Sequence, residues 1–224
     1  MMQEPNFEEL LAQLESSDET DRKFAVEDLG AMKRPEAILP LAQRLMDASA
    51  SVREAAIEAL ISIGSKDVAA ALAPIVASEH VAGRNAALDV MVGLGRSAIA
   101  AIHGSLLETD NADLKKFGLD ALLRIGELDP QQDARTISRV GDLLYDPNAN
   151  VAGAAIEVLA MKPNLANPEL FLNFVGKGSW LEMNALFALA QYPKEQTAPL
   201  LRMIDARSLH PQAASVLKKI TEGL

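Results

Sequence analysis

The stretch that decides the fold is Val52-Arg53-Glu54-Ala55-Ala56-Ile57-Glu58-Ala59-Leu60-Ile61-Ser62-Ile63-Gly64. It places a small residue, Ala56, four positions before a large aliphatic one, Leu60, on a helical apolar period that ends at a glycine. The same spacing recurs along the chain, and its members are Ala25/Leu29, Ala56/Leu60, Ala87/Met91, Gly118/Leu122, Ala155/Leu159, Ala185/Leu189 and Ala213/Leu217. Because a repeat of about thirty residues is typical of stacked helical units, the sequence predicts an array of seven units.

Each predicted unit holds a second apolar stretch about twenty residues before its small residue, such as Ile38, Leu41 and Leu45. The period of these stretches is also helical, and no segment sustains the alternation of a half-buried strand. Gly64, Gly95 and Gly126 follow second helices, where a left-handed residue relieves the last turn. The sequence thus predicts an all-α superhelix of about seven antiparallel helix pairs. The predicted units are 5–34, 35–65, 66–95, 96–127, 128–163, 164–192 and 193–224, in a single solenoid spanning 1–224.

The run Val-Arg-x-x-Ala-x-x-x-Leu-x-x-x-Gly at residues 52–64 resembles the HEAT repeat. It is most similar to the short bacterial HEAT-like class also found in phycobilisome lyases, and the resemblance covers essentially the whole chain. It implies an armadillo-like α-solenoid whose second helices lie on the concave side. It implies little about function, because such solenoids serve as scaffolds, adaptors, chaperones and occasionally enzymes.

Composition excludes several function classes. The chain has 224 residues, 49% of them apolar, no cysteine and a formal net charge of −10. A disulfide framework, a thiolate metal site and a cysteine nucleophile are therefore absent, and the net charge repels phosphate backbones and anionic lipid surfaces. No basic segment followed by an apolar one opens the sequence as in a secretory leader, and the longest apolar run, Val68 to Ala77, is too short for a membrane span. We expect a cytoplasmic protein that binds neither nucleic acid nor membrane, and a monomer because the terminal helices have polar capping residues.

Catalytic and metal-binding signatures are weak in this sequence. His80, His103 and His210 fall in different units, and none pairs with another at helical spacing. No glycine-rich phosphate loop and no nucleophile elbow are found. We therefore expect no catalytic residue, no metal and no cofactor, and we interpret the three histidines as structural.

Two charged ridges are predicted on the second helices of the first units. A basic residue stands three positions before the small residue in four units, at Arg22, Arg53, Arg84 and Lys115. An acid stands two positions after it in five units, at Glu27, Glu58, Asp89, Asp120 and Glu157. The resemblance implies that the basic ridge bonds to loops or acids of neighbouring units as a structural ladder, with an electrostatic recognition surface as the alternative. The acidic ridge is interpreted as a solvated face or as a docking site for a basic segment of a partner.

The pattern changes from the fifth unit onward, where charge falls and aromatic residues gather. Residues 1–126 have a net charge of −8 and residues 127–224 one of −2, and the second part holds six of the nine aromatic residues. Trp180, Met183 and Phe187 form a second apolar stripe beside the core stripe of their helix. Such a stripe is either covered by the chain itself or offered to a partner as an aromatic-anchored groove.

The leading hypothesis is a non-enzymatic scaffold or adaptor that binds a partner protein on its concave face. The alternative is a bilin lyase-like or chaperone-like HEAT protein that holds a tetrapyrrole or its acceptor protein, although no catalytic motif of that family can be placed on this chain. HEAT-like DNA glycosylases share the architecture, but they need a basic concave surface, and the first half of this chain is acidic.

Overall fold

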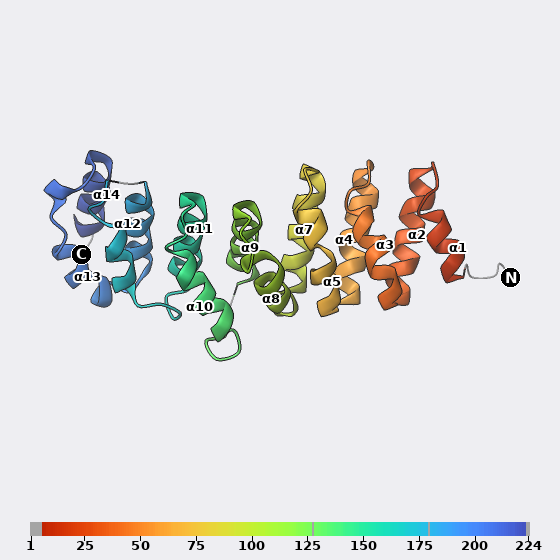
Figure 1. Ribbon diagram of the computed structural model, residues 1–224, viewed down its shortest axis with the longest axis horizontal. Helices are drawn as coiled ribbons and strands as arrows, with labels where there is room; N and C mark the ends of the chain where they lie inside the picture. The colour runs from red at the N-terminus through yellow and green to blue at the C-terminus, as the bar shows by residue number, and fades with distance from the viewer. Residues whose placement is uncertain (1–5, 127, 179, 223–224) are drawn as a thin grey trace. The chain divides into compact units, whose positions relative to one another are not determined.

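The computed structural model describes residues 6–126, 128–178 and 180–222, and all regular structure within these ranges is helical (Figure 1). The chain divides between Ile125 and Gly126 into two compact bodies, called here the N-terminal and the C-terminal body. The predicted units that include residues 5, 127, 179 or 223–224 lie partly outside the described residues. Each body is a succession of helix pairs, as the repeat predicts.

The N-terminal body holds four helix pairs. Their second helices each span 14 residues, and they are α2 (Glu19–Met32), α4 (Ala50–Ile63), α7 (Val81–Leu94) and α9 (Ala112–Ile125). Their first helices are α1 (Phe7–Gln13), α3 (Ile38–Arg44) after the 3₁₀ turn η1 (Pro35–Ala37), α5 (Lys66–Ala71) with α6 (Ala73–Val76), and α8 (Arg96–Ile102) with the π-helical η2 (His103–Leu107).

The small residue of each repeat lets its two helices approach closely. At Gly118 in α9, an added Cβ would lie 2.9 Å from Leu106 Cβ and 2.9 Å from Leu107 Cδ2, both in η2 of the same pair. The large residue four positions later, Leu122, is fully buried one turn along the same face. The pattern read from the sequence therefore marks the contact between the two helices of a pair.

One first helix of the N-terminal body is broken in two by a proline. Pro74 has no N–H to donate to the preceding turn, so the apolar run from Val68 onward forms α5 and α6 with a junction at Leu72. Val68, Leu72 and Val76 are nevertheless all buried. The break changes the local backbone and leaves the core stripe of the helix intact.

The C-terminal body holds three further pairs. They are α10 (Ala134–Leu143) with α11 (Ala149–Ala160), η3 (Pro168–Phe174) with α12 (Leu181–Gln191), and α13 (Lys194–Arg202) with α14 (Pro211–Glu222), the last two joined through the 3₁₀ turn η4 (Ala206–Ser208). The first member of the middle pair, η3, is a 3₁₀ helix where the sequence predicts an α-helix. A 3₁₀ helix has three residues per turn, so Pro168, Phe171 and Phe174 share one face, and all three are buried.

Of the glycines predicted to be left-handed, Gly64 agrees with the prediction and Gly95 differs from it. Gly64 ends α4 in the left-handed region with φ 66° and ψ 10°, as expected. Gly95 also has a positive φ of 56°, but its ψ is −130°, so it is not left-handed helical. The reason is that Gly95 is at once the last cap of α7 and the first cap of α8, and the chain must turn there without a linker.

Candidate partner-binding surface

The predicted apolar stripe lies on α12 and is half exposed. Trp180 caps the helix with 46% of its surface accessible, and Phe187, two turns later, has 52%. Met183 between them is half-buried. The opposite face of α12 is covered by the core, where Ala185 and Leu189 are fully buried. The described part of the chain therefore covers the stripe only in part, and its role as a partner-binding surface stays a prediction.

The tryptophan ring is seated on the neighbouring second helix. A Cβ added at Gly153 of α11 would lie 2.9 Å from Trp180 Cζ3 and would also collide with Cη2 of the same ring. The Asn184 side chain lies slightly farther away, with Nδ2 at 3.2 Å from that position. The edge of the Trp180 indole thus packs against Gly153, while 46% of the residue remains accessible to solvent.

A side chain at Gly153 is expected to lift Trp180 from this seat. In a Gly153→Val variant, the valine methyl groups would occupy the space of the indole edge, and the indole can swing outward because it is the far end of a side chain. We expect greater acrylamide quenching of Trp180, the only tryptophan of the chain, with a loss of stability of about 1–2 kcal/mol in urea titrations. Unchanged quenching would show that the ring does not rest on Gly153.

Four of the five acids of the predicted ridge are exposed and Asp120 is half-buried, and three of the five form ion pairs with basic residues of the same body. Glu27 lies 3.4 Å from Lys23, Asp120 lies 2.8 Å from Lys116, and Asp89 in α7 lies 3.0 Å from Arg124 in α9. Exposed pairs of this kind contribute little to stability and exchange readily with other cations. The geometry therefore leaves these carboxylates available to a basic partner.

Glu27 and Glu58 both line a hollow between α2 and α4. The hollow has a volume of about 240 Å³, and its other lining residues are Gly30, Ala31, Ala55, Ala59 and Ser62. It exists because small residues line both helices there, so no large side chain fills the space. Glu157, the fifth member of the predicted ridge, lies on α11 of the C-terminal body and is exposed.

Two members of the predicted basic ladder contact the loop six residues before them. Arg22 donates from Nη1 to the carbonyl of Ser16 at 2.9 Å, and Arg53 donates from Nη1 to the carbonyl of Asp47 at 2.7 Å. Arg22 also reaches the following pair, with Nε 2.9 Å and Nη2 2.8 Å from the two carboxylate oxygens of Asp47. Arg84 is half-buried and Lys115 is buried. The ladder role of the four residues as a set stays a prediction.

Glu182 in α12 occupies the repeat position that Arg22 and Arg53 hold in α2 and α4. The two arginines donate hydrogen bonds to the preceding loop, whereas Glu182 accepts one from it. Its Oε1 accepts a hydrogen bond from the backbone N–H of Gly176, six residues earlier, at 2.7 Å. Its Oε2 accepts from the backbone N–H of His210, just before α14, at 3.2 Å. The side chain is fully buried and joins the loop before α12 to the start of α14. Sequence analysis missed this role, although its signal was an acid at the repeat position that is basic in the first four units.

Acid is expected to weaken the junction between the first two pairs. Burial opposes ionisation of Asp47, but hydrogen bonds from Arg22 and from the Ser49 N–H prevail and hold the pKa of the carboxyl below its ordinary value of 3.8. A carboxyl whose pKa is lower in the folded than in the unfolded chain stabilises the fold above the unfolded pKa, and this contribution is lost as pH falls through the folded pKa.

The measurement is the urea midpoint of wild type and Asp47→Asn between pH 7 and pH 2, followed by circular dichroism. We expect the wild type to lose more stability than the variant below about pH 4. Equal losses in both would show that Asp47 is not linked to this acid transition.

The three histidines have structural positions. Nδ1 of His80 accepts a hydrogen bond from the Gly83 N–H at 2.9 Å and caps α7. His103 is buried in η2, with Nε2 3.2 Å from Glu108 Oε1. His210 precedes α14, where its Nδ1 accepts from the Gln212 N–H at 3.4 Å. The described residues contain no group of three His, Cys, Asp or Glu side chains placed to hold a metal ion. None of their helices has the length and apolarity needed to cross a bilayer.

Comparison with known proteins assigns the repeat. Residues 7–91 match the family model for HEAT repeats, whereas no curated protein matches the chain. Among solved structures, the archaeal HEAT-like repeats protein from Thermococcus onnurineus NA1 is 15% identical with a TM-score of 0.51, over 98% of this chain and 97% of that one. Residues 7–91 are therefore similar to HEAT repeats, and the chain has the fold of a HEAT-like α-solenoid.

Two further structures are similar at lower scores. The MAST/Orbit N-terminal domain is 15% identical with a TM-score of 0.49, over 99% of this chain and 98% of that one. The complex of CpcE and CpcF of phycocyanin lyase from Nostoc sp. PCC7120 is 20% identical with a TM-score of 0.37, over 99% of this chain and 96% of that one. Scores at this level carry no argument about pigment binding or any other activity.

Proposed function

We propose that this protein is a non-enzymatic scaffold that binds a partner protein through its second helices. The observation that carries the proposal is the stripe of Trp180, Met183 and Phe187, since two of its three side chains are about half exposed in a helix whose other face is packed. Large aromatic side chains that are held rigidly at a surface are the usual anchors of protein interfaces. The seat on Gly153 supplies that rigidity, so the partner need not order the ring on binding.

The acidic residues of the N-terminal body support a partner with a basic segment. Glu27, Glu58, Asp89 and Asp120 project from successive second helices, and the sequence up to residue 126 has a net charge of −8. A field of this sign accelerates the approach of a cationic partner more than it tightens the complex. We therefore expect added salt to slow association, and association rates that stay constant up to molar salt would contradict the steering role.

Repetition argues against catalysis at the same acids. A pair of carboxylates that divide the roles of acid and base needs two different environments, whereas the ridge repeats one exposed environment along the body. The proposal therefore assigns no chemical step, no metal and no cofactor to this surface.

The test is affinity capture with a variant in which the stripe is made polar, Trp180→Ser/Met183→Glu/Phe187→Glu. All three side chains lie on the half-exposed face, so we expect the variant to keep the circular dichroism spectrum of the wild type. The matched control is Leu39→Glu/Met203→Glu, which puts acids at two exposed apolar residues outside the stripe. We expect a partner that the wild type and the control retain and that the stripe variant loses. A partner retained equally by all three proteins would remove the stripe from the proposal.

A further inference from the structure

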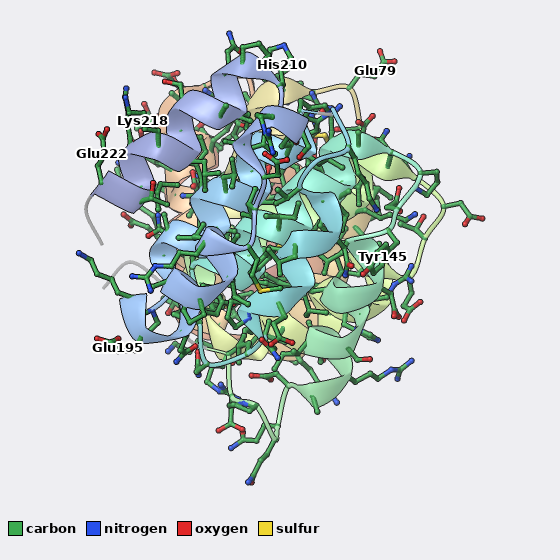
Figure 2. The ribbon with its side chains drawn as sticks, turned by 90° about the vertical axis from the view of Figure 1, so that its left-hand side faces the viewer. Glu79, Tyr145, Glu195, His210, Lys218 and Glu222 are labelled. Atoms are coloured by element: carbon green, nitrogen blue, oxygen red, sulfur yellow. The ribbon has the colours of Figure 1, made fainter. Side chains whose placement is uncertain are left out.

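A second surface of the C-terminal body lies far along the chain from the acidic ridge. A groove of about 720 Å³ runs between α13 and α14 and has a mainly apolar floor, formed by Leu201, Ile204, Ala214 and Leu217. Arg202 and Lys218 also line it, one from each helix. Figure 2 views the protein from the side of these helices and shows Lys218 and Glu222 projecting from α14 into solvent.

The repeat identifies this groove as a stacking face. Lys218 stands five residues after the small residue of its unit, and the equivalent residues of the first two units are Gly30 and Ile61. Both face the following pair, because a Cβ at Gly30 would lie 2.5 Å from Ala59 Cβ and a Cβ at Gly93 would lie 2.8 Å from Ile61 Cγ1. The groove beside Lys218 is thus the place where another helix of the repeat would pack, and no described segment of the chain covers it.

Lys218 is charged, unlike Gly30 and Ile61, which hold the equivalent repeat position at two stacking faces inside the array. The groove places two cations beside an apolar floor, in a chain with a net charge of −10. Arg202 is exposed and takes part in none of the ion pairs and side-chain hydrogen bonds among the described residues. Lys218 lies 3.6 Å from Glu222, and since both are more than 60% exposed this pair competes weakly with other acids. The adjacent acid, Asp205, is already bonded to Arg207.

We propose that this groove binds an amphipathic α-helix of a partner protein, packed as an additional repeat helix would be. The apolar floor requires leucine-like residues at helical spacing on the bound face. The two cations require acidic residues beside that face, because a lysine or arginine there would meet like charge. The proposal concerns a site separate from the α12 stripe, and either can fail without the other.

The experiment uses the full chain and two synthetic helical peptides of about fourteen residues, each with leucines at positions i, i+3, i+4 and i+7. One peptide carries glutamates beside the leucines and the other carries lysines at the same positions. Fluorescence anisotropy of the labelled peptides measures binding. We expect the glutamate peptide to bind the wild type at least about tenfold more tightly than the lysine peptide, since two ion pairs are exchanged for two repulsions.

Matched variants assign the binding to the groove. Arg202→Glu/Lys218→Glu reverses both cations and should weaken the affinity for the glutamate peptide by about tenfold. The control Lys177→Glu/Lys219→Glu changes the charge equally at exposed residues that do not line the groove, and it should change the affinity by less than about threefold. All of these side chains are exposed, so folding should persist.

Three outcomes would overturn the proposal. The first is binding of the glutamate peptide that Arg202→Glu/Lys218→Glu leaves unchanged. The second is loss of the peptide in the Trp180→Ser/Met183→Glu/Phe187→Glu variant, which would place the peptide on α12. The third is concentration-dependent dimerisation in sedimentation velocity that Arg202→Glu/Lys218→Glu abolishes, which would assign the groove to a second copy of the chain.

Discussion

Replacing Gly30 with valine is expected to lower the free energy of unfolding by about 3 kcal/mol. The added Cβ would lie 2.5 Å from Ala59 Cβ and 2.9 Å from Ala59 Cα, so α2 and α4 would have to separate. Helix propensity alone predicts the opposite sign, because removing a glycine from a helix interior usually gains up to about 1 kcal/mol. The measurement is urea unfolding followed by far-ultraviolet circular dichroism.

The matched control is Gly141→Ala in α10, where an added Cβ meets no atom within 4 Å. Propensity should prevail there and leave stability unchanged or higher by about 0.5–1 kcal/mol. A Gly30→Val protein as stable as the control would show that α2 and α4 are not in close contact.

Replacing Glu182 with alanine is expected to cost about 2–4 kcal/mol. The change removes a fully buried carboxylate and leaves the N–H groups of Gly176 and His210 without the acceptor that it supplies. Glu182→Gln should lose less, because its amide oxygen can still accept one of the two hydrogen bonds. Urea unfolding measures all of these variants, with Glu195→Ala on the exposed side of α13 as the control expected to stay within about 0.5 kcal/mol of wild type. A Glu182→Ala protein within the same range would remove this carboxylate from the set of residues that hold α12 and α14 together.

The repeat predicted the fold because the two helices of each pair pack through the same arrangement of small and large residues. A small residue followed four positions later by a large aliphatic one is enough to mark a second helix and its partner, which is why the pairs could be placed from Ala25 to Leu217. The local exceptions depend on particular residues. Pro74 divides a first helix, and the spacing of Pro168, Phe171 and Phe174 favours three residues per turn over 3.6. Such preferences were visible in the sequence, but their outcome depends on which side chains the neighbouring pair buries.

The candidate site was only partly predictable. Helical spacing alone indicated that Trp180, Met183 and Phe187 share one face of α12. The seat on Gly153 was not predictable, because it depends on the register between two helices separated by a long loop and η3. The hydrogen bond from Arg22 to Asp47 joins residues 25 positions apart, and the one from His210 to Glu182 joins residues 28 positions apart. The second bond to Glu182 fixes a loop. A periodic pattern carries no information about such partners. The groove between α13 and α14 likewise depends on how those helices pack.

The central claim is that a partner protein binds over the stripe on α12, and the sole tryptophan of the chain reports on it directly. Titrating the captured partner, in a form without tryptophan, into the wild type at constant protein concentration should move the Trp180 emission to shorter wavelength and reduce its quenching by acrylamide, both saturating with the same dissociation constant. This result is expected because a half-exposed indole would become buried in the interface. Saturable binding, shown independently by calorimetry, with the emission and quenching of Trp180 unchanged would contradict the claim and place the partner elsewhere on the protein.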